Sequence, residues 1–320
     1  MNKKRFILSL LFIVFVIASL LIGVSSELTL KSLLSGNKEA YNVLFRSRMP
    51  RTLAIILSAS SLSIAGLIMQ SLSRNKFISP QTAGTNDAAA FGVLISFIFL
   101  GSIPSYYRLI FSFVFALISS LLFIFILNKI KFKNIIYVPL IGLMYGGLLS
   151  AVTRLIAYET NTLQLLSSLN LGTFSHINVL NGSMLLILVP VLLIAIIFAE
   201  GFNVASLGEE FATNLGVNYK KVLFLGLIVT SLIAASTYLV VGPLPFLGLI
   251  IPNIVSMYYG DNLKKNIIDI ALLGSIFVLA NDIISRLVIF PFELSVGFTM
   301  GITGAIIFIL LIFKQVKNND

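Results

Sequence analysis

Long apolar runs separated by short polar segments form the main pattern along this chain. A helix that crosses a bilayer needs about 20 mostly apolar residues. At that length the sequence predicts ten spanning helices, at 6–24, 52–72, 86–100, 109–127, 135–157, 183–199, 222–241, 244–259, 267–290 and 296–313. The eighth is short and has Pro243, Pro245 and Pro252 in or beside it, which predicts a broken or kinked helix. If the seventh and eighth runs form one re-entrant unit, there are nine spans.

The first apolar run also has features of a signal peptide, because it follows a basic start, MNKKRF, and ends in small residues. However, the run is about as long as a full membrane span, and more spans follow at once. We therefore expect a retained first helix, with cleavage as the alternative. Residues 1–320 are expected to form a single all-α transmembrane domain.

Composition supports the membrane interpretation and excludes several kinds of site. Hydrophobic residues make up 58% of the chain and charged residues 11%, whereas soluble domains carry about 25% charged residues. The absence of cysteine excludes disulfides and thiolate ligands, and the single histidine, His176, excludes a site with several imidazoles. His176 is expected in a solvated loop. We predict no catalytic centre, no metal site and no cofactor.

The basic residues predict how the chain is oriented. The net charge is +10, and the lysines and arginines lie in short clusters between apolar runs, as in membrane proteins and unlike nucleic-acid binders. An even number of spans with most clusters inside places both termini in the cytoplasm. The stretch RSRMPR violates this bias, since it puts Arg46, Arg48 and Arg51 on the outer face. Those charges are expected to have another task.

One polar segment, ASLGEEFATNLGVNYKK, interrupts the apolar pattern at 205–221, on the predicted cytoplasmic side. Ser206 is predicted to cap a helix of about two turns that stops at Gly216. An apolar stripe along this helix consists of Leu207, Phe211 and Leu215. The stripe suits either the lipid surface or a groove of a partner protein. Acidic residues at the start of the helix disfavour the anionic inner leaflet.

Four sequence blocks, in order, resemble those of a known family over about residues 44–313. They are RMPRTLAIILSASSLSIAGLIMQSLSRNKFISPQTAGT, SLGEEFATNLGVN, VGPLPFLGLIIPNIVSMYYGDNLKKN and LANDIISRLVIFPFELSVGFTMGITGAIIFILLI. The chain resembles the membrane subunits of iron–siderophore and cobalamin ABC importers, the type II ABC permeases. The forms of its blocks are similar to a branch associated with catecholate or petrobactin-type ferric siderophores. The resemblance implies the type II permease fold with about ten transmembrane helices.

The resemblance also implies partners and site residues. It implies a permease that moves ferric siderophore inward across the bacterial plasma membrane with a second permease, cytoplasmic ATPases and a substrate-binding protein. The segment 205–218 would be the ATPase-coupling helix, through Leu207, Gly208, Glu209, Glu210, Ala212, Leu215 and Gly216. Arg48, Arg51 and Arg286 would meet the binding protein. An ion pair with Asp282 is an alternative task for Arg286. The chain has no G-x-x-x-x-G-K-[ST] phosphate loop, so a separate chain must hydrolyse ATP.

The substrate pathway is expected to involve Gly142, Gly146, Ser150 and Asp87, although the first three also suit helix packing. Asp87 is expected near the inner end of the third span, where a helix N-terminal role is an alternative. Other functions stay open. A cobalamin or haem importer would have the same fold, a proton- or sodium-driven transporter would use carboxylates at membrane depth, and an integral membrane enzyme would need a cluster of catalytic groups.

Overall fold

The computed structural model describes residues 3–23, 32, 35, 37–101, 104–129 and 137–319, which contain helices and no strand. Residue 24 and residues 135–136, at the ends of two predicted spans, lie outside this part. The helices are α1 (Lys3–Leu21), α3 (Lys38–Val43), the π-helix η1 (Leu44–Arg48), α4 (Met49–Ser73), α5 (Thr85–Leu100), α6 (Ser105–Lys129), α7 (Tyr137–Glu159), α8 (Leu163–Leu169), α9 (Val179–Gly182), the 3₁₀ helix η2 (Ser183–Ile187), α10 (Leu188–Ile197), α11 (Ala199–Ala205), α12 (Glu209–Asn214), α13 (Tyr219–Val240), α14 (Leu247–Tyr259), α15 (Leu263–Leu287) and α16 (Val296–Asn319).

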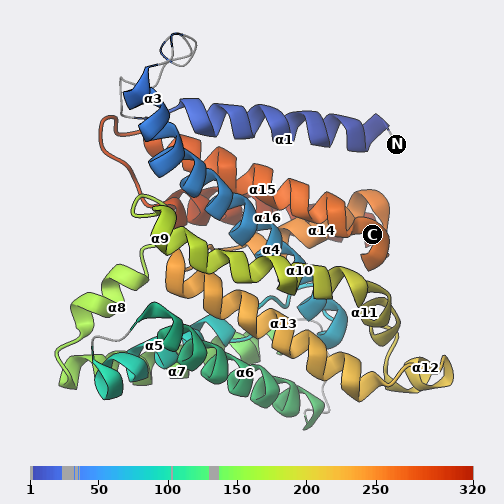
Figure 1. The fold of residues 1–320 in the computed structure, drawn as a ribbon. Coiled ribbons are helices and arrows are strands. Elements are labelled where there is room, and N and C mark those ends of the chain that lie inside the picture. The colour runs from blue at the N-terminus through green and yellow to red at the C-terminus, as the bar shows by residue number, and fades with distance from the viewer. Residues whose placement is uncertain are drawn as a thin grey trace.

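The long helices run side by side through the molecule (Figure 1). Among the described residues, seven helical stretches have the length and apolar composition needed to cross a membrane, and three shorter apolar helices accompany them. In Figure 1 the start of α1, the end of α16 and α12 lie at the same end of the bundle, here called the α12 end. The opposite end, here called the α3 end, carries α3, α8 and α9.

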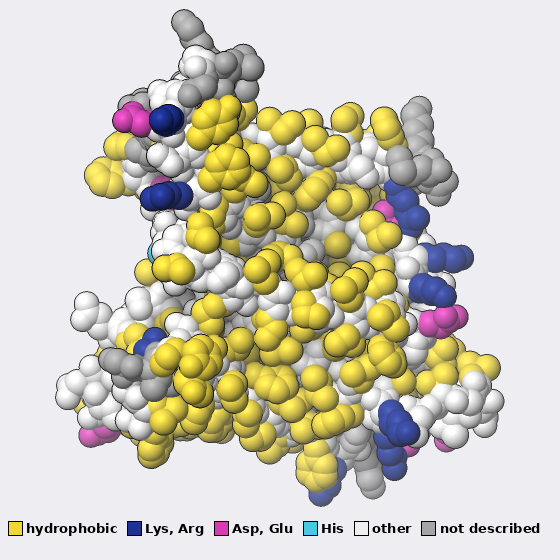
Figure 2. Space-filling view, viewed as in Figure 1, with side chains coloured by type: hydrophobic (Ala, Val, Ile, Leu, Met, Phe, Trp, Pro, Cys, Tyr) yellow, Lys and Arg dark blue, Asp and Glu magenta, His cyan; other side chains and the backbone are white. Residues whose placement is uncertain are grey.

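The surface has the pattern of a protein that lies in a bilayer. Figure 2 shows hydrophobic side chains across the middle of one face, whereas charged side chains gather toward the two ends of the bundle. Exposed side chains of α10 and α16 include Leu193, Ile197, Ile306 and Leu310. Apolar side chains on the surface are stable when lipid surrounds them, because only contact with water is unfavourable for them.

Helix α4 is the central helix of the bundle, and most of its side chains are buried. It approaches α14 so closely that a Cβ atom on Gly66 would overlap the backbone of Gly248. Small residues allow this contact, as is usual between membrane helices. The hydroxyls of Ser58 and Ser63 donate back to carbonyls one turn earlier on α4, so they remain satisfied in the apolar interior.

Pro252 lies inside α14, which continues as one helix from Leu247 to Tyr259. Proline has no backbone N–H, so the carbonyl one turn earlier, on Gly248, loses its helical donor. Gln70 Nε2 on α4 donates to this carbonyl at 3.5 Å and to the Leu249 carbonyl at 3.3 Å. The buried amide thus satisfies backbone groups that the proline leaves exposed at membrane depth.

Helix α5 begins in the middle of the bundle and not at its α12 end. The hydroxyls of Thr85 and Ser120 are 3.0 Å apart, and Ser231 donates to Ser120 at 3.1 Å. Ser120 lies well inside α6 and Ser231 near the middle of α13. The first turn of α5 is therefore at membrane depth. This corrects the expectation that Asp87, in that turn, lies near the inner interface.

Candidate functional site

The polar segment 205–221 lies at the α12 end and contains the three-residue turn after α11, helix α12 and the start of α13. The predicted N-cap was wrong, because Ser206 ends α11 and its hydroxyl donates to the Asn203 carbonyl at 2.7 Å. Helix α12 begins instead after Gly208, whose φ is +109°, a conformation that favours glycine. Glu209 and Glu210 fall in its first turn, where the helix dipole favours anions.

The stop at Gly216 agrees with the prediction. Gly216 has φ +77°, its N–H donates to the Thr213 carbonyl, and the Val217 N–H donates to the Ala212 carbonyl. These two bonds form a Schellman motif, which closes a helix end through a left-handed residue. Two glycines within the segment, Gly208 and Gly216, therefore set where α12 begins and ends.

The apolar stripe of this segment points away from the rest of the chain. Leu207, Phe211 and Leu215 are 55%, 64% and 62% exposed, whereas Ala212 on the other face is buried. Within the described chain, the stripe is not covered by the other helices of the bundle. Leu207, Gly208, Glu209, Glu210 and Phe211 line an open hollow together with Arg74, which follows α4.

Polar contacts tie α11 to the start of α15. Lys264 Nζ lies 2.7 Å from Glu200 Oε2, and the hydrogen bond from Lys264 lowers the pKa of the Glu200 carboxyl. The Leu263 N–H donates to Asn203 Oδ1 at 3.3 Å. A displacement of α11 would therefore act directly on α15.

A second set of contacts joins the 74–84 segment to the turn between α14 and α15. Lys76 Nζ lies 2.9 Å from Asp261 Oδ1, and Ser256 donates to the same carboxylate. Burial raises the pKa of Asp261, but hydrogen bonds from Ser256 and Lys76 outweigh it and the net shift is downward. Asn253 Nδ2 donates to the Lys76 carbonyl at 2.8 Å.

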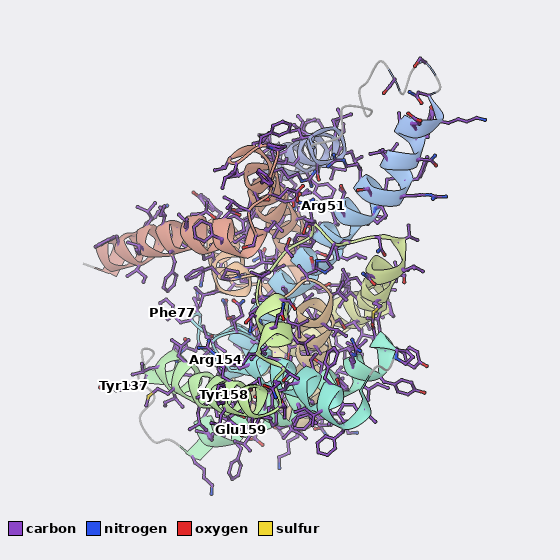
Figure 3. The ribbon with its side chains drawn as sticks, turned by 90° about the vertical axis from the view of Figure 1, so that its left-hand side faces the viewer. Arg51, Phe77, Tyr137, Arg154, Tyr158 and Glu159 are labelled. Carbon is purple, nitrogen blue, oxygen red and sulfur yellow. The ribbon has the colours of Figure 1, made fainter. Side chains whose placement is uncertain are left out.

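At the α3 end, a buried group of charges contains all three arginines predicted to meet a binding protein. Arg51 pairs with Asp282 at 2.7 Å and with Glu293 at 2.8 Å, and Arg286 also pairs with Asp282. Figure 3 shows Arg51 in the upper part of the molecule, among α1, α4 and α15. The i, i+4 pair of Asp282 with Arg286 that the sequence suggested is present. Glu293 was not predicted, because nothing in its local sequence marks it as a partner of Arg51.

The same arginines close the end of α1. Arg286 Nη1 donates to the carbonyls of Ser19 and Ile22 at 2.9 and 2.8 Å, and Arg48 Nη1 donates to Ile22 at 3.1 Å. The last carbonyls of a helix lack intrahelical donors and carry partial negative charge. The three arginines carry three positive charges, whereas Asp282 and Glu293 supply two negative ones. The partial negative charge of these carbonyls therefore adds to that of the two carboxylates. Arg48, Arg51 and Arg286 are all buried in the described chain.

Two of the four predicted pathway residues, Asp87 and Ser150, line a pocket of about 240 Å³ that contains several polar groups. Gly142 and Gly146 lie where α7 approaches the start of α5, since Cβ atoms there would meet the Thr82 carbonyl and Asp87 Oδ2. The pocket is lined by Gln81, Asn86, Asp87, Ala90, Ser150, Thr153, Arg154, Leu166, Asn170, Tyr238, Pro243 and Pro245. Residues such as Asn86, Asn170 and Tyr238 escaped prediction because they come from separate parts of the chain.

His176 lies outside these groups. Its ring is exposed, as predicted, and its Nε2 lies 2.9 Å from the Val240 carbonyl. No group of three or more His, Cys, Asp or Glu side chains that could hold a metal ion occurs in the described part of the chain.

Comparison with known proteins agrees with this architecture. The petrobactin import system permease protein YclN of Bacillus subtilis (strain 168) is 44% identical over 313 residues, 98% of each chain. The ferric-anguibactin transport system permease protein FatD of Vibrio anguillarum is 39% identical over 281 residues, 88% of this chain and 90% of that one. A solved metal-chelate type ABC transporter in an inward-facing conformation superposes with a TM-score of 0.82 at 24% identity, over 98% of this chain and 100% of that one.

The fold is therefore that of an ABC importer permease, an all-α, multi-pass membrane protein. Residues 10–314 match the model of the FecCD transport family. The chain belongs to the FecCD transport family.

Proposed function

We propose that this chain is the membrane permease subunit of an ABC importer that moves ferric siderophore inward across the bacterial plasma membrane. The observation that carries the proposal is the self-contained α12 segment, which presents an apolar stripe without a partner in the described chain. The similarity to permeases named for petrobactin and ferric-anguibactin supports the substrate class. The α12 end is then cytoplasmic, with both termini on that side.

The ATPase is proposed to bind the segment through Leu207, Gly208, Glu209, Glu210, Ala212, Leu215 and Gly216. Phe211 joins this set because it is the most exposed member of the stripe. An apolar stripe with an acidic rim suits a groove of a soluble partner. When the ATPases close, α12 would move with them, and α11 would carry this motion to α15 through Lys264 and Leu263.

A substrate-binding protein is proposed to dock at the α3 end. Because Arg48, Arg51 and Arg286 are buried, we propose that they support docking from within, by fixing the ends of α1 and α15 and the position of Glu293. A second permease, either a copy of this chain or a related one, completes the importer. The pathway is proposed to pass Gly142, Gly146, Ser150 and Asp87, beside the polar pocket.

The proposal is tested first by co-purification of the permease with its ATPase. Reversal of Glu209 and Glu210 to lysine, or Phe211→Ser, is expected to abolish co-purification and leave the permease folded. Leu193→Ala is the matched control, because Leu193 is equally apolar and 56% exposed but lies on α10. Co-purification that survives both changes in the segment would contradict coupling at this site.

Uptake of a panel of ferric siderophores, cobalamin and haem tests the substrate class. The complete importer is reconstituted in liposomes with its binding protein, and ferric siderophores are expected to stimulate both uptake and ATP hydrolysis. Stimulation by cobalamin or haem alone would overturn the substrate class. Uptake that survives removal of ATP but collapses with the proton gradient would indicate a secondary transporter.

A further inference from the structure

The pocket between α5, α7, α8 and the turn after α13 lies beside the proposed pathway and contains polar groups whose ligand the proposed function does not specify. Figure 3, which faces the α3 end, shows Arg154 on α7 near Tyr158 and Glu159, well below Arg51. The pocket extends inward from Arg154 to Asp87, in the first turn of α5. It is separate from the buried arginine group.

Two oxygen-bearing side chains in this pocket lack a side-chain partner. Asn86 is only 9% exposed, and its Oδ1 accepts no hydrogen bond from the described residues. Asp87 forms no ion pair within 4.0 Å in the described chain, and the hydrogen bond that it receives comes from its own backbone. An unpartnered carboxylate at membrane depth is costly and marks a functional site.

Some protons of the neighbouring polar groups are already donated within the chain. The Thr153 hydroxyl donates to the Leu149 carbonyl at 2.7 Å, and the Tyr238 hydroxyl donates to Asn170 Oδ1 at 3.0 Å. One proton of Asn170 Nδ2 is donated to the Leu166 carbonyl at 3.1 Å. The two hydroxyl oxygens therefore retain lone pairs as acceptors, in addition to those of Asn86 and Asp87.

Arg154 does not neutralise this cluster of acceptors. It lines the pocket, but its side chain is exposed and forms no ion pair within the described residues. Asp87 lies in the first turn of α5, beside the positive end of the helix dipole. A ligand with positive charge and N–H donors would pair with the Asp87 carboxylate and with Asn86 Oδ1.

We propose that this pocket binds a protonated amine, with Asp87 as its counter-ion and Asn86 Oδ1 as a hydrogen-bond acceptor. A primary ammonium has three donors on one compact charge, which matches acceptors that converge from different helices. That the amine is carried by the transported chelate rests on the proposed function. The pocket would then select chelates with cationic arms over those with neutral ones.

Binding of 1,4-diaminobutane to the full chain in lipid nanodiscs tests the proposal, with 1,4-butanediol as the neutral comparison. The measurement uses neither the ATPase nor the binding protein, so its result does not depend on the outcome of the uptake assay with the complete importer. The wild type is expected to bind the diamine and not the diol. Asp87→Asn is expected to weaken diamine binding at least about tenfold, since it removes a charge-assisted pair. Glu159→Gln, which removes an exposed carboxylate from the same helix as Arg154, is expected to change nothing.

Two further variants give the sign of the charge preference. Arg154→Gln is expected to tighten diamine binding a few-fold, because it removes a repelling cation, and Asn86→Asp is expected to tighten it more. Asn86→Asp also keeps the proposal testable if Asp87→Asn does not fold. Unchanged affinity in Asp87→Asn, or weaker binding in Asn86→Asp, would overturn the proposal. Tighter binding of sulfate in Asp87→Asn with its loss in Arg154→Gln would instead identify an anion pocket.

Discussion

Replacing Asp282 tests the buried charge group most directly. Its carboxylate is fully buried and pairs with two arginines, Arg51 and Arg286, which are themselves buried. Asp282→Asn keeps the shape of the side chain but leaves three buried arginines with one carboxylate, on Glu293. Removing one partner from a buried ion pair costs about 3–5 kcal/mol.

The matched control is Asp261→Asn. The Asp261 side chain is 68% exposed and pairs with an exposed lysine, and such surface pairs contribute about 0–1 kcal/mol. The two variants make the same chemical change, so the difference between them measures burial. We therefore expect Asp282→Asn to lower the melting temperature at least about three times as much as Asp261→Asn.

The assay is thermal unfolding of the purified permease in detergent, followed by loss of the monodisperse peak in size-exclusion chromatography. A double variant sharpens it. Asp282→Leu with Arg286→Met removes both charges of one pair and leaves Arg51 with Glu293. It should be more stable than Asp282→Leu alone, because an apolar replacement of a buried pair is often neutral. The reasoning is refuted if Asp282→Asn and Asp261→Asn melt together.

Three other outcomes follow from the fold. Gln70→Leu should destabilise the permease by about 1–3 kcal/mol, since the Gly248 carbonyl loses its donor; the same melting assay measures this, and Gln70→Glu should not restore stability because it brings no N–H. Gly66→Ala should lower the melting temperature more than Gly147→Ala, because a Cβ at Gly66 overlaps the Gly248 backbone and at Gly147 meets nothing within 4 Å. The pair of Lys76 with Asp261 lowers the folded pKa of that carboxyl, so the small stabilisation from the pair is present at neutral pH and is lost as the pH falls through the lowered pKa. The melting temperatures of wild type and Asp261→Asn should therefore converge at acidic pH. A difference between the two that stays constant with pH would contradict the linkage.

Local sequence was sufficient to predict the parts of the site that depend on neighbours along the chain. The acidic first turn of α12 and its stop at Gly216 follow from helical spacing and from glycine's left-handed freedom, and Leu207, Phe211 and Leu215 are all exposed although only Phe211 lies within α12. The start of α12 was predicted wrongly at Ser206, because a hydroxyl residue also ends helices. Its side chain bonds back to α11 in this chain.

Contacts across the bundle could not be predicted in this way. Glu293 reaches Arg51 across 242 residues of sequence, and Gln70 reaches Gly248 across 178. Hydropathy predicts which residues lie on helices, but it does not give the rotation or the shift of one helix against another. It therefore cannot identify side-chain partners across the bundle. The depth of Asp87 was misjudged for the same reason, since α5 starts at mid-bundle through contacts with α6 and α13.

The sequence by itself determined an all-α membrane protein, because apolar runs of spanning length leave the backbone no other way to satisfy its hydrogen bonds in lipid. It also determined that a polar segment, residues 205–221, interrupts those runs. Only the tertiary structure decided where the charges go. Packing buried the three arginines of the α3 end against Asp282, Glu293 and the end of α1, and left Asn86 Oδ1, beside Asp87, without a donor among the described residues. That difference arises because ion pairs and pockets are formed by side chains from distant helices, whose relative placement no local pattern contains.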